Sequence, residues 1–161
     1  LWDPALGASA LLDVGIYPLT FAHLVLGGPR TIAAAGVLSD QGIDVSGGAT
    51  LVYDSGAVAS IAWTQLAYTD NRASVSGHLG NIQVPARFHH PDELELTVER
   101  VTETLRRPRV GKGYSHEIEE VAACLRDGRT ESAVLPLDET VAIMAQMDEI
   151  RRQIAARATS H

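Results

Sequence analysis

The sequence has a single cysteine, Cys124, and a single lysine, Lys112, among its 161 residues. One cysteine excludes an internal disulfide framework and a zinc site built on several thiolates. We expect Cys124 to be a buried, unreactive thiol on the apolar side of a helix. Long apolar runs are also missing: the stretch from Ile16 to Leu26 is the longest of that character, and Pro18, Thr20 and His23 interrupt it. It is too short to span a bilayer and suits a buried helix.

Positive charge is scarce as well. The formal net charge is −7, and Lys and Arg form no extended cluster. A nucleic-acid backbone or an anionic membrane surface is therefore a poor partner on electrostatic grounds. The densest basic stretch, residues 106–112, is interpreted as a solvated loop before a helix, with a phosphate contact as the less favoured alternative.

The size and composition are those of one globular domain, because 45% of the residues are hydrophobic. The chain begins at Leu1 with neither an initiator Met nor a signal-like stretch. We interpret it as a fragment of a longer polypeptide that acts in the cytoplasm, and a targeting sequence ahead of Leu1 stays open.

The first part of the chain predicts a helix that ends at Leu26, where Gly27-Gly28-Pro29 supplies a C-cap glycine and a proline stop. Pro18 cannot lie deep inside a regular helix without the loss of a hydrogen bond. Either the regular helix begins near Tyr17, with Pro18 in its first turn, or the helix is kinked there.

The middle of the chain predicts strands joined by short turns, so we expect antiparallel hairpins. Asp54-Ser55-Gly56 is the strongest hairpin signal. The predicted strands are 31–39, 45–53, 57–66, 72–77, 81–85 and 94–98.

The last part predicts two helices. One begins at the N-cap Ser115, has an apolar stripe of Ile118, Val121 and Leu125, and closes at Gly128. The other follows Pro136, with one stripe of Val141, Met144, Met147, Ile150 and Ile154.

Strands between helices indicate an α+β domain with helices on one face of a mostly antiparallel, open-faced sheet. Both faces of 57–66 are apolar or small, and neither carries a charge. We therefore expect helices to bury one face and another protein surface to bury the other.

Several common functional motifs are missing. The sequence has no G-x-G-x-x-G after a strand and no G-x-S-x-G. His116-Glu117 lacks the second histidine of a metalloprotease helix, and the adjacent His89 and His90 have no third ligand nearby. We predict no metal site.

One constellation remains, namely Asp13, Gly15 and Tyr17. On a helix, Asp13 and Tyr17 project on the same side, and Gly15 lets a flat ligand or a backbone approach closely. A carboxylate and a phenol can handle the proton of an alcohol or carbonyl substrate. From spacing alone, the simpler interpretation is favoured: Asp13 caps the helix, Gly15 eases packing and Tyr17 is a core aromatic.

Resemblance to a family reverses that preference. Residues 7–19, GASALLDVGIYPL, are similar to the G-G-G-x-L-x-D-x-G-x-[H/Y] signature of the glucose–fructose oxidoreductase, inositol dehydrogenase and rhizopine-catabolism superfamily. The tyrosine form resembles its dimeric dihydrodiol dehydrogenase and NADP-dependent D-xylose dehydrogenase branch. Residues 113–121, GYSHEIEEV, and 128–132, GRTES, resemble the branch's late helix and Gly-x-x-Glu-Ser turn. Gly7-Ala8-Ser9 departs from the three glycines, which puts close approach of the backbone to a ligand in doubt.

The resemblance implies a glyceraldehyde-3-phosphate dehydrogenase-like C-terminal domain over residues 1–161 that binds substrate and dimerises, without its first strand. The Rossmann domain and the lysine of a Glu-Lys-Pro motif would lie upstream, and Lys112 does not match that motif. The parent would be an NAD(P)-dependent oxidoreductase acting on a secondary alcohol or carbonyl of a sugar or cyclic diol.

The resemblance also implies roles for the three residues of the constellation. Tyr17 would be the acid/base, Asp13 would orient substrate hydroxyls or hold the lysine, and Gly15 would lie near substrate or cofactor. A free phenol has a pKa of about 10 and needs a neighbouring cation to work near neutral pH. Without its first domain, we expect the chain to bind neither NAD nor NADP and to be inactive.

A second hypothesis is a non-catalytic dimerisation module that uses the open face of the sheet, and we expect a homodimer through that face. The substrate and the choice between NAD and NADP are not determined by these residues.

Overall fold

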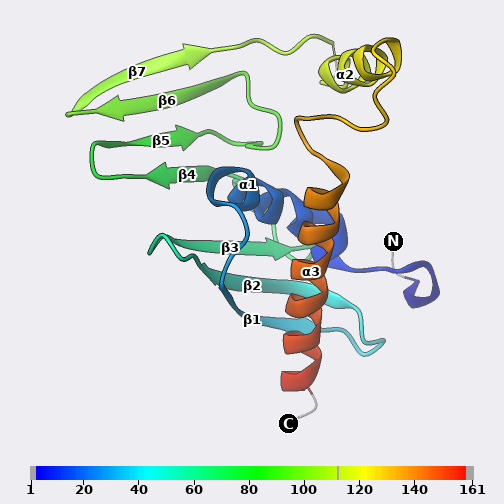
Figure 1. Ribbon diagram of the computed structural model, residues 1–161. Helices are drawn as coiled ribbons and strands as arrows, with labels where there is room; N and C mark the ends of the chain where they lie inside the picture. The colour runs from blue at the N-terminus through cyan, green and yellow to red at the C-terminus, as the bar shows by residue number, and fades with distance from the viewer. Residues whose placement is uncertain (1–2, 112, 159–161) are drawn as a thin grey trace. The chain divides into compact units, whose positions relative to one another are not determined.

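The computed structural model describes residues 3–111 and 113–158, so Lys112 and the first two residues of the sequence lie outside the described part. The chain forms two compact units, and each is described by itself. Unit 1 consists of Leu1–Tyr68 and Leu137–His161, and unit 2 of Thr69–Pro136. Figure 1 labels the helices and strands of both.

Unit 1 contains a three-stranded antiparallel sheet in the order β1-β2-β3. The strands are β1 (Thr31–Leu38), β2 (Asp44–Val52) and β3 (Val58–Thr64). The predicted hairpin at 54–56 is confirmed: Tyr53 N–H donates to Ala57 O at 3.0 Å, and Gly56 has φ +84°. A residue with a side chain is strained at that φ, so glycine is the fitting choice for this turn.

The N-terminal helical segment of unit 1 has three parts. A 3₁₀ turn η1 (Pro4–Leu6) precedes a π-helical turn η2 (Leu11–Gly15), which leads directly into α1 (Ile16–Leu26). Pro18 lies in the first turn of α1, where its missing N–H is tolerated because the π-helical turn precedes it. The predicted end is confirmed, since Gly27 has φ +78° and its N–H donates to His23 O at 2.8 Å.

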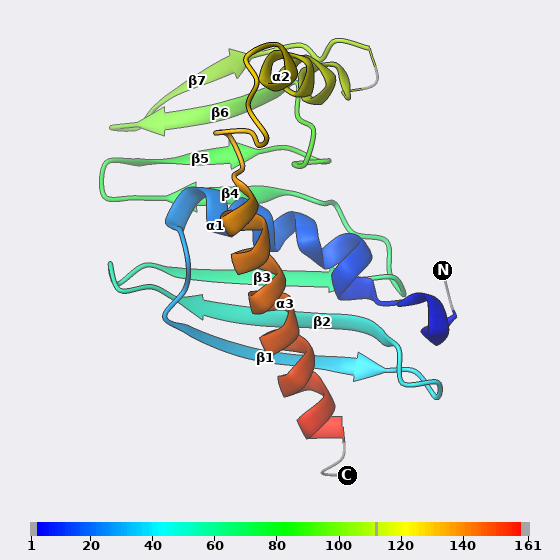
Figure 2. The same cartoon turned by 45° about the vertical axis from the view of Figure 1, so that its right-hand side comes forward.

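Helices α1 and α3 (Leu137–Ala158) both lie over one face of the unit 1 sheet, as the two ribbon views agree (Figures 1 and 2). The stripe predicted for α3 is only partly correct, because Val141 and Met144 are 66% and 38% exposed. The buried stripe is Ile143, Met147, Ile150 and Ile154, which recur at helical spacing and join Leu11, Leu19 and Leu51 in the core.

The opposite face of this sheet carries no helix within the described residues of unit 1. Rows of paired residues run across it, for example Ala33, Thr50 and Ser60, and then Ala35, Gly48 and Ala62. Val37 and Val58 on this face are 57% and 60% exposed. The α+β class with antiparallel strands is confirmed, as is the burial of one face by helices. The cover over the other face stays a prediction.

Unit 2 contains a four-stranded antiparallel sheet in the order β4-β5-β6-β7. The strands are β4 (Ala73–Ser76), β5 (Gly80–Val84), β6 (Glu93–Val98) and β7 (Val101–Arg106). Strand β7 was missed by sequence reasoning, because its turn is Glu99-Arg100, with φ +49° and +71°. Neither residue is a typical turn former, so the turn gives no local signal.

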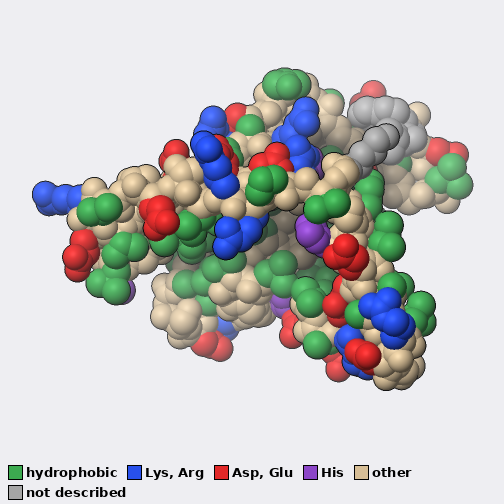
Figure 3. Space-filling model, turned by 90° about the horizontal axis from the view of Figure 1, so that it is seen from above, with side chains coloured by type: hydrophobic (Ala, Val, Ile, Leu, Met, Phe, Trp, Pro, Cys, Tyr) green, Lys and Arg blue, Asp and Glu red, His purple; other side chains and the backbone are tan. Residues whose placement is uncertain are grey.

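The basic stretch that begins at Arg106 is a loop over 107–111, as predicted. Arg109 pairs with Asp92 through two nitrogens, at 2.9 and 3.0 Å, and Arg106 pairs with Glu93 at 3.0 Å. In the view of Figure 3, arginine side chains lie among acidic ones rather than in a continuous basic patch. Two of the three described arginines in this stretch are therefore paired with carboxylates, while Arg107 donates to a backbone carbonyl.

Helix α2 (Ser115–Arg126) differs in two details from the helix predicted from the sequence. Ser115 is not the N-cap: it is the first helical residue, and its Oγ donates to Val110 O at 2.9 Å. The predicted stripe of Ile118, Val121 and Leu125 is exposed, at 65%, 55% and 73%. The helix does end at the predicted place, where Gly128 has φ +68°.

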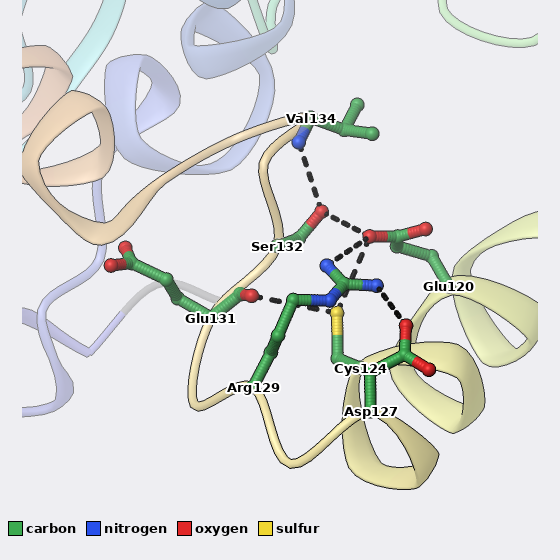
Figure 4. Close-up of polar contacts among 7 residues, drawn as sticks. All are labelled: Glu120, Cys124, Asp127, Arg129, Glu131, Ser132 and Val134. Atoms are coloured by element: carbon green, nitrogen blue, oxygen red, sulfur yellow. Dashed lines mark hydrogen bonds and ion pairs between the residues drawn. The ribbon is translucent and has the colours of Figure 1, made fainter.

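Cys124 is buried, as predicted, but its neighbours at the end of α2 form a polar cluster rather than the apolar side that we expected (Figure 4). One carboxylate oxygen of Glu120 accepts hydrogen bonds from the Cys124 thiol at 3.3 Å and from Ser132 Oγ at 2.8 Å. Burial raises the pKa of the Cys124 thiol, and the bond to Glu120 raises it further. The cluster ties the turn at 128–132 to α2, which gives the Glu-Ser motif a structural role.

Candidate functional site

The candidate site is a hollow of about 330 Å³ in unit 1, beside the first turns of the N-terminal helical segment. Its polar lining residues are Asp3, Ser9, Asp13 and Gln65, and the rest of the lining is Leu6, Gly7, Ala8 and Leu12. Among the described residues that line it, two are carboxylates and none is Lys, Arg or His. The hollow is therefore acidic and rich in hydrogen-bonding groups.

Two side chains satisfy the first backbone N–H groups of the helical segment. Ser9 Oγ accepts from Leu12 N–H at 3.1 Å, and the buried carboxylate of Asp44 accepts from Leu11 N–H at 2.7 Å. The positive end of the helix favours such a carboxylate. Ser9, which stands where the family signature has its third glycine, therefore acts as a cap. Asp44 was missed, because its partner is 33 residues away in the sequence.

Gly15 is buried against the aromatic ring of β3. A Cβ built on Gly15 would lie 3.1 Å from Trp63 Cγ and 2.8 Å from Leu11 Cδ1. The absence of a side chain thus lets the π-helical turn pack directly on Trp63, and π-helical turns occur often at functional sites. The interpretation that Gly15 eases packing is confirmed, while its closeness to a ligand stays a prediction.

Asp13 lines the hollow and is held there by Gln65. The Nε2 of Gln65, just beyond β3, donates to Asp13 Oδ2 at 3.2 Å. Sequence reasoning missed Gln65, because it lies 52 residues from Asp13 and belongs to no motif. The favoured alternative from spacing alone, in which Asp13 caps the helix, finds no support, since Ser9 and Asp44 hold the capping bonds.

Tyr17 lies four residues beyond Asp13 on the same continuous helical segment and is 47% exposed. It is not a fully buried core aromatic, which contradicts the simpler interpretation from spacing. The described lining of the hollow includes Asp13 but neither Tyr17 nor Gly15. The structure thus places Asp13 in the hollow and Tyr17 at the accessible start of α1.

A buried histidine connects α1 to α3. His23 is 6% exposed, its Nε2 contacts the carboxylate of Glu139, and its Nδ1 lies 2.9 Å from Gln146 Nε2. These contacts fix the helix that carries Tyr17 against α3. The sequence showed His23 only as an interruption of an apolar run, so its partners were not predictable locally.

Over residues 3–111 and 113–158, no group of three or more His, Cys, Asp or Glu side chains is arranged to hold a metal ion. No helix in the same part of the chain combines the length and the apolar character needed to cross a membrane.

Comparison with known proteins identifies a domain family and several named relatives. Residues 1–83 match the family model of the GFO/IDH/MocA C-terminal domain. The trans-1,2-dihydrobenzene-1,2-diol dehydrogenase of Xenopus tropicalis is 31% identical over 161 residues, which cover 94% of this chain and 48% of that protein. The enzyme of that name from Homo sapiens is 33% identical, with 94% and 48% covered. The chain spans about half the length of these curated relatives.

Solved structures share the fold at lower identity. The aldose-aldose oxidoreductase of Caulobacter crescentus, complexed with glycerol, has a TM-score of 0.79 at 20% identity and covers 93% of this chain and 46% of that one. A 3-ketoreductase from Actinomadura kijaniata in complex with NADP has a TM-score of 0.72 at 21% identity, with 92% and 48% covered. These likenesses extend the similarity beyond residue 83 to both units.

Proposed function

The chain belongs to the GFO/IDH/MocA C-terminal domain family, and from that membership we propose that it is the substrate-binding half of an NAD(P)-dependent dehydrogenase. The substrate is a secondary alcohol or carbonyl of a sugar or cyclic diol. The observation that carries the proposal is the hollow beside Asp13, on the same helical segment as Tyr17. The relatives are named for reactions on a dihydrodiol, an aldose and a ketone, which supports this substrate class.

The described residues do not fit the cofactor itself. A dinucleotide carries a diphosphate, and the carboxylates of Asp3 and Asp13 would repel it in a hollow without a described basic residue. The sequence also has no G-x-G-x-x-G loop. We assign NAD(P) binding to another part of the intact protein, for which the relatives' greater length leaves room.

The residues of this chain supply the proton transfer and the orientation of substrate. Tyr17, which is 47% exposed at the start of α1, exchanges the proton of the reacting hydroxyl. Asp13 accepts a hydrogen bond from a substrate hydroxyl and so orients the reacting carbon. A phenol needs a neighbouring cation to act near neutral pH, so we expect a basic group of the intact protein beside Tyr17.

Kinetics of the intact protein test the role of Tyr17. Tyr17→Phe removes only the hydroxyl, and we expect kcat to fall at least roughly a hundredfold, as the loss of an acid/base does. Tyr68→Phe is the matched control, because Tyr68 is fully exposed in unit 1. Turnover of Tyr17→Phe close to that of the wild type would contradict the proposal.

The isolated chain is a second test. We propose that it binds neither NAD nor NADP tightly and has no turnover by itself, because its acidic hollow does not suit a diphosphate. Calorimetric titration of the 161-residue chain with each dinucleotide measures this. A tight site for either one would contradict the assignment of the cofactor to another part of the protein.

A second candidate function is homodimerisation, and the uncharged open face of the unit 1 sheet favours it. A sheet face without charged side chains suits a protein–protein contact, because the core of such contacts is depleted of charged residues. The two functions are compatible, since the hollow lies beside the helical segment that covers the other face.

A further inference from the structure

We propose that Gln65 is a positioning residue: it holds the carboxylate of Asp13 so that the two side chains together bind neighbouring hydroxyl groups of an uncharged polyhydroxy ligand. The proposal rests on the proposed function for the assignment of this ligand as the substrate. The pairing of Gln65 with Asp13, and the preference for an uncharged ligand, stand on the geometry of unit 1 alone.

The backbone fixes where the Gln65 side chain points. Its N–H donates to Val45 O at 2.9 Å, which continues the pairing of β2 with β3 past the end of the strand. Side chains alternate along a strand, so Gln65 shares a face with Ile61 and Trp63. Those two are buried under the helical segment, at 9% and 4% exposure, and Gln65 is consequently directed toward the turn that carries Asp13.

The hydrogen bond to Asp13 determines the orientation of the Gln65 side-chain amide. An ionised carboxylate only accepts hydrogen bonds, so the nitrogen of Gln65 must face Asp13. The amide oxygen then lies on the other side, where it is buried and has no hydrogen-bond partner among the described residues. A buried acceptor without a partner is uncommon in folded proteins, so we attribute this orientation of the amide to the bond between its nitrogen and Asp13.

The pair presents a donor next to an acceptor at the wall of the hollow. Gln65 Nε2 has a second hydrogen beyond the one it gives to Asp13, and the carboxylate has further lone pairs. A hydroxyl group both donates and accepts, so two adjacent hydroxyls match this pair, one donating to Asp13 and the other accepting from Gln65. A single carbonyl or an apolar ligand would leave half of the pair unused.

The charges of the lining select against anions. Asp3 and Asp13 both line the hollow, and no described basic residue offsets them there. The amide of Gln65 orients Asp13 without neutralising it. A ligand with a carboxylate or phosphate group would meet repulsion at short range in a partly enclosed site. The geometry therefore favours a neutral sugar or cyclic polyol.

Nuclear magnetic resonance on the 161-residue chain tests the pair. We expect Asp13→Asn, which removes the charge of the acceptor, to move the side-chain amide signal of Gln65. D-glucose should perturb the signals of Asp13 and Gln65, and D-glucuronate, which adds a carboxylate to the same ring, should bind at least roughly tenfold more weakly.

Substitution of Gln65 completes the test. Gln65→Leu should weaken glucose binding at least roughly tenfold, whereas the exposed control Gln41→Leu should leave it unchanged. The proposal is overturned if glucose does not bind, if glucuronate binds equally well, or if Gln65→Leu binds as the wild type does.

Kinetics of the intact protein separate this proposal from the proposed function. Gln65→Leu should raise KM more than it lowers kcat, while Tyr17→Phe should lower kcat. If Tyr17→Phe abolishes turnover and Gln65→Leu leaves KM unchanged, the role of Gln65 fails and the dehydrogenase function stands. If no nicotinamide-dependent turnover occurs but glucose still perturbs Asp13 and Gln65, the binding pair stands and the dehydrogenase function fails.

Discussion

Gly15 is the residue on which the close packing of the N-terminal helical segment depends. Its Cα faces Trp63, and any Cβ would come within 3.1 Å of the indole ring and 2.8 Å of Leu11. The position is helical, so alanine would by itself favour the local conformation by about 1 kcal/mol. Packing and propensity therefore oppose each other at this residue.

We predict that Gly15→Ala destabilises the chain by about 1–3 kcal/mol, because the methyl group overpacks a filled core site and outweighs the gain in helix propensity. Urea unfolding measures the change. Gly28→Ala is the control, since a Cβ at Gly28 meets nothing within 4 Å. Equal stability of the two variants would show that the contact with Trp63 does not constrain Gly15.

Asp44 is the second residue with a decisive contact. Its buried carboxylate accepts the N–H of Leu11 at 2.7 Å and lies at the positive end of the helical segment. We predict that Asp44→Ala lowers the free energy of unfolding by about 2 kcal/mol, because a buried N–H loses a charged acceptor. Asp54→Ala, at a mostly exposed carboxylate, should change it little. Thermal unfolding of both variants compares them, and similar losses would contradict the capping role.

At the scale of elements, the side-chain amide of Gln153 on α3 hydrogen-bonds to the backbone at the outer edge of β1. Gln153 Oε1 accepts from Ala34 N–H at 2.8 Å, and its Nε2 donates to Ile32 O at 2.8 Å. These are the groups through which a further strand would pair. The edge strand Thr31–Leu38 has no charged residue of its own, so this cover protects it from pairing with other chains.

We predict that Gln153→Leu destabilises unit 1 by about 1–3 kcal/mol and promotes aggregation, since a backbone donor and acceptor lose their partners. Chemical unfolding and turbidity on storage measure the two effects. Arg157→Leu, at an exposed position of the same helix, is the control. A Gln153→Leu protein with wild-type stability and solubility would argue against edge protection.

Glu149, close to Gln153 on α3, should make the stability of the fold depend on pH. Hydrogen bonds from Arg152 and Gln153 lower the pKa of Glu149 to about 2. A carboxyl whose pKa is lower in the folded state stabilises the fold above its ordinary pKa, and that contribution is lost as the pH falls toward 2. We expect Glu149→Gln to flatten the dependence of stability on pH in this acid range. Unfolding of both proteins from pH 6 to pH 2 checks it, and parallel curves would contradict it.

At the scale of the whole molecule, the open face of the unit 1 sheet is the surface through which we expect self-association. Ala35, Gly48 and Ala62 form one row across its three strands, and no charged residue lies on the face. We predict that the chain dimerises through this face, because small and neutral side chains allow two sheets to approach closely.

A single charge tests that contact. Ala62→Glu should shift the chain from dimer to monomer, since a carboxylate buried between two sheets is strongly unfavourable. Light scattering measures the mass, and Ala155→Glu, at an exposed position of α3, should leave it unchanged. A wild-type chain that stays monomeric at high concentration would contradict the prediction, as would a dimeric Ala62→Glu.

Most helix ends and turns could be predicted from residues close together in the sequence. Glycine and proline mark the end of α1 at Leu26, the hairpin at Gly56 and the start of α3 after Pro136, because each restricts the backbone at its own position. Strand β7 could not be predicted in this way. The turn before it is formed by Glu99 and Arg100, which adopt positive φ although neither residue type favours it. The buried side of α3 was also ambiguous, because Val141 and Met144 are as apolar as the residues that pack.

The sequence by itself determined the α+β class, the ends of α1 and α2, the start of α3 and the spacing of Asp13, Gly15 and Tyr17, because these depend on residues within a few positions of one another. Only the tertiary structure decided that Asp44 caps Leu11, that Gly15 packs on Trp63 and that Gln65 holds Asp13. Each of these partners is more than thirty residues away in the sequence. These partners meet because the helical segment packs on the sheet, and local propensity does not predict which residues that packing brings together.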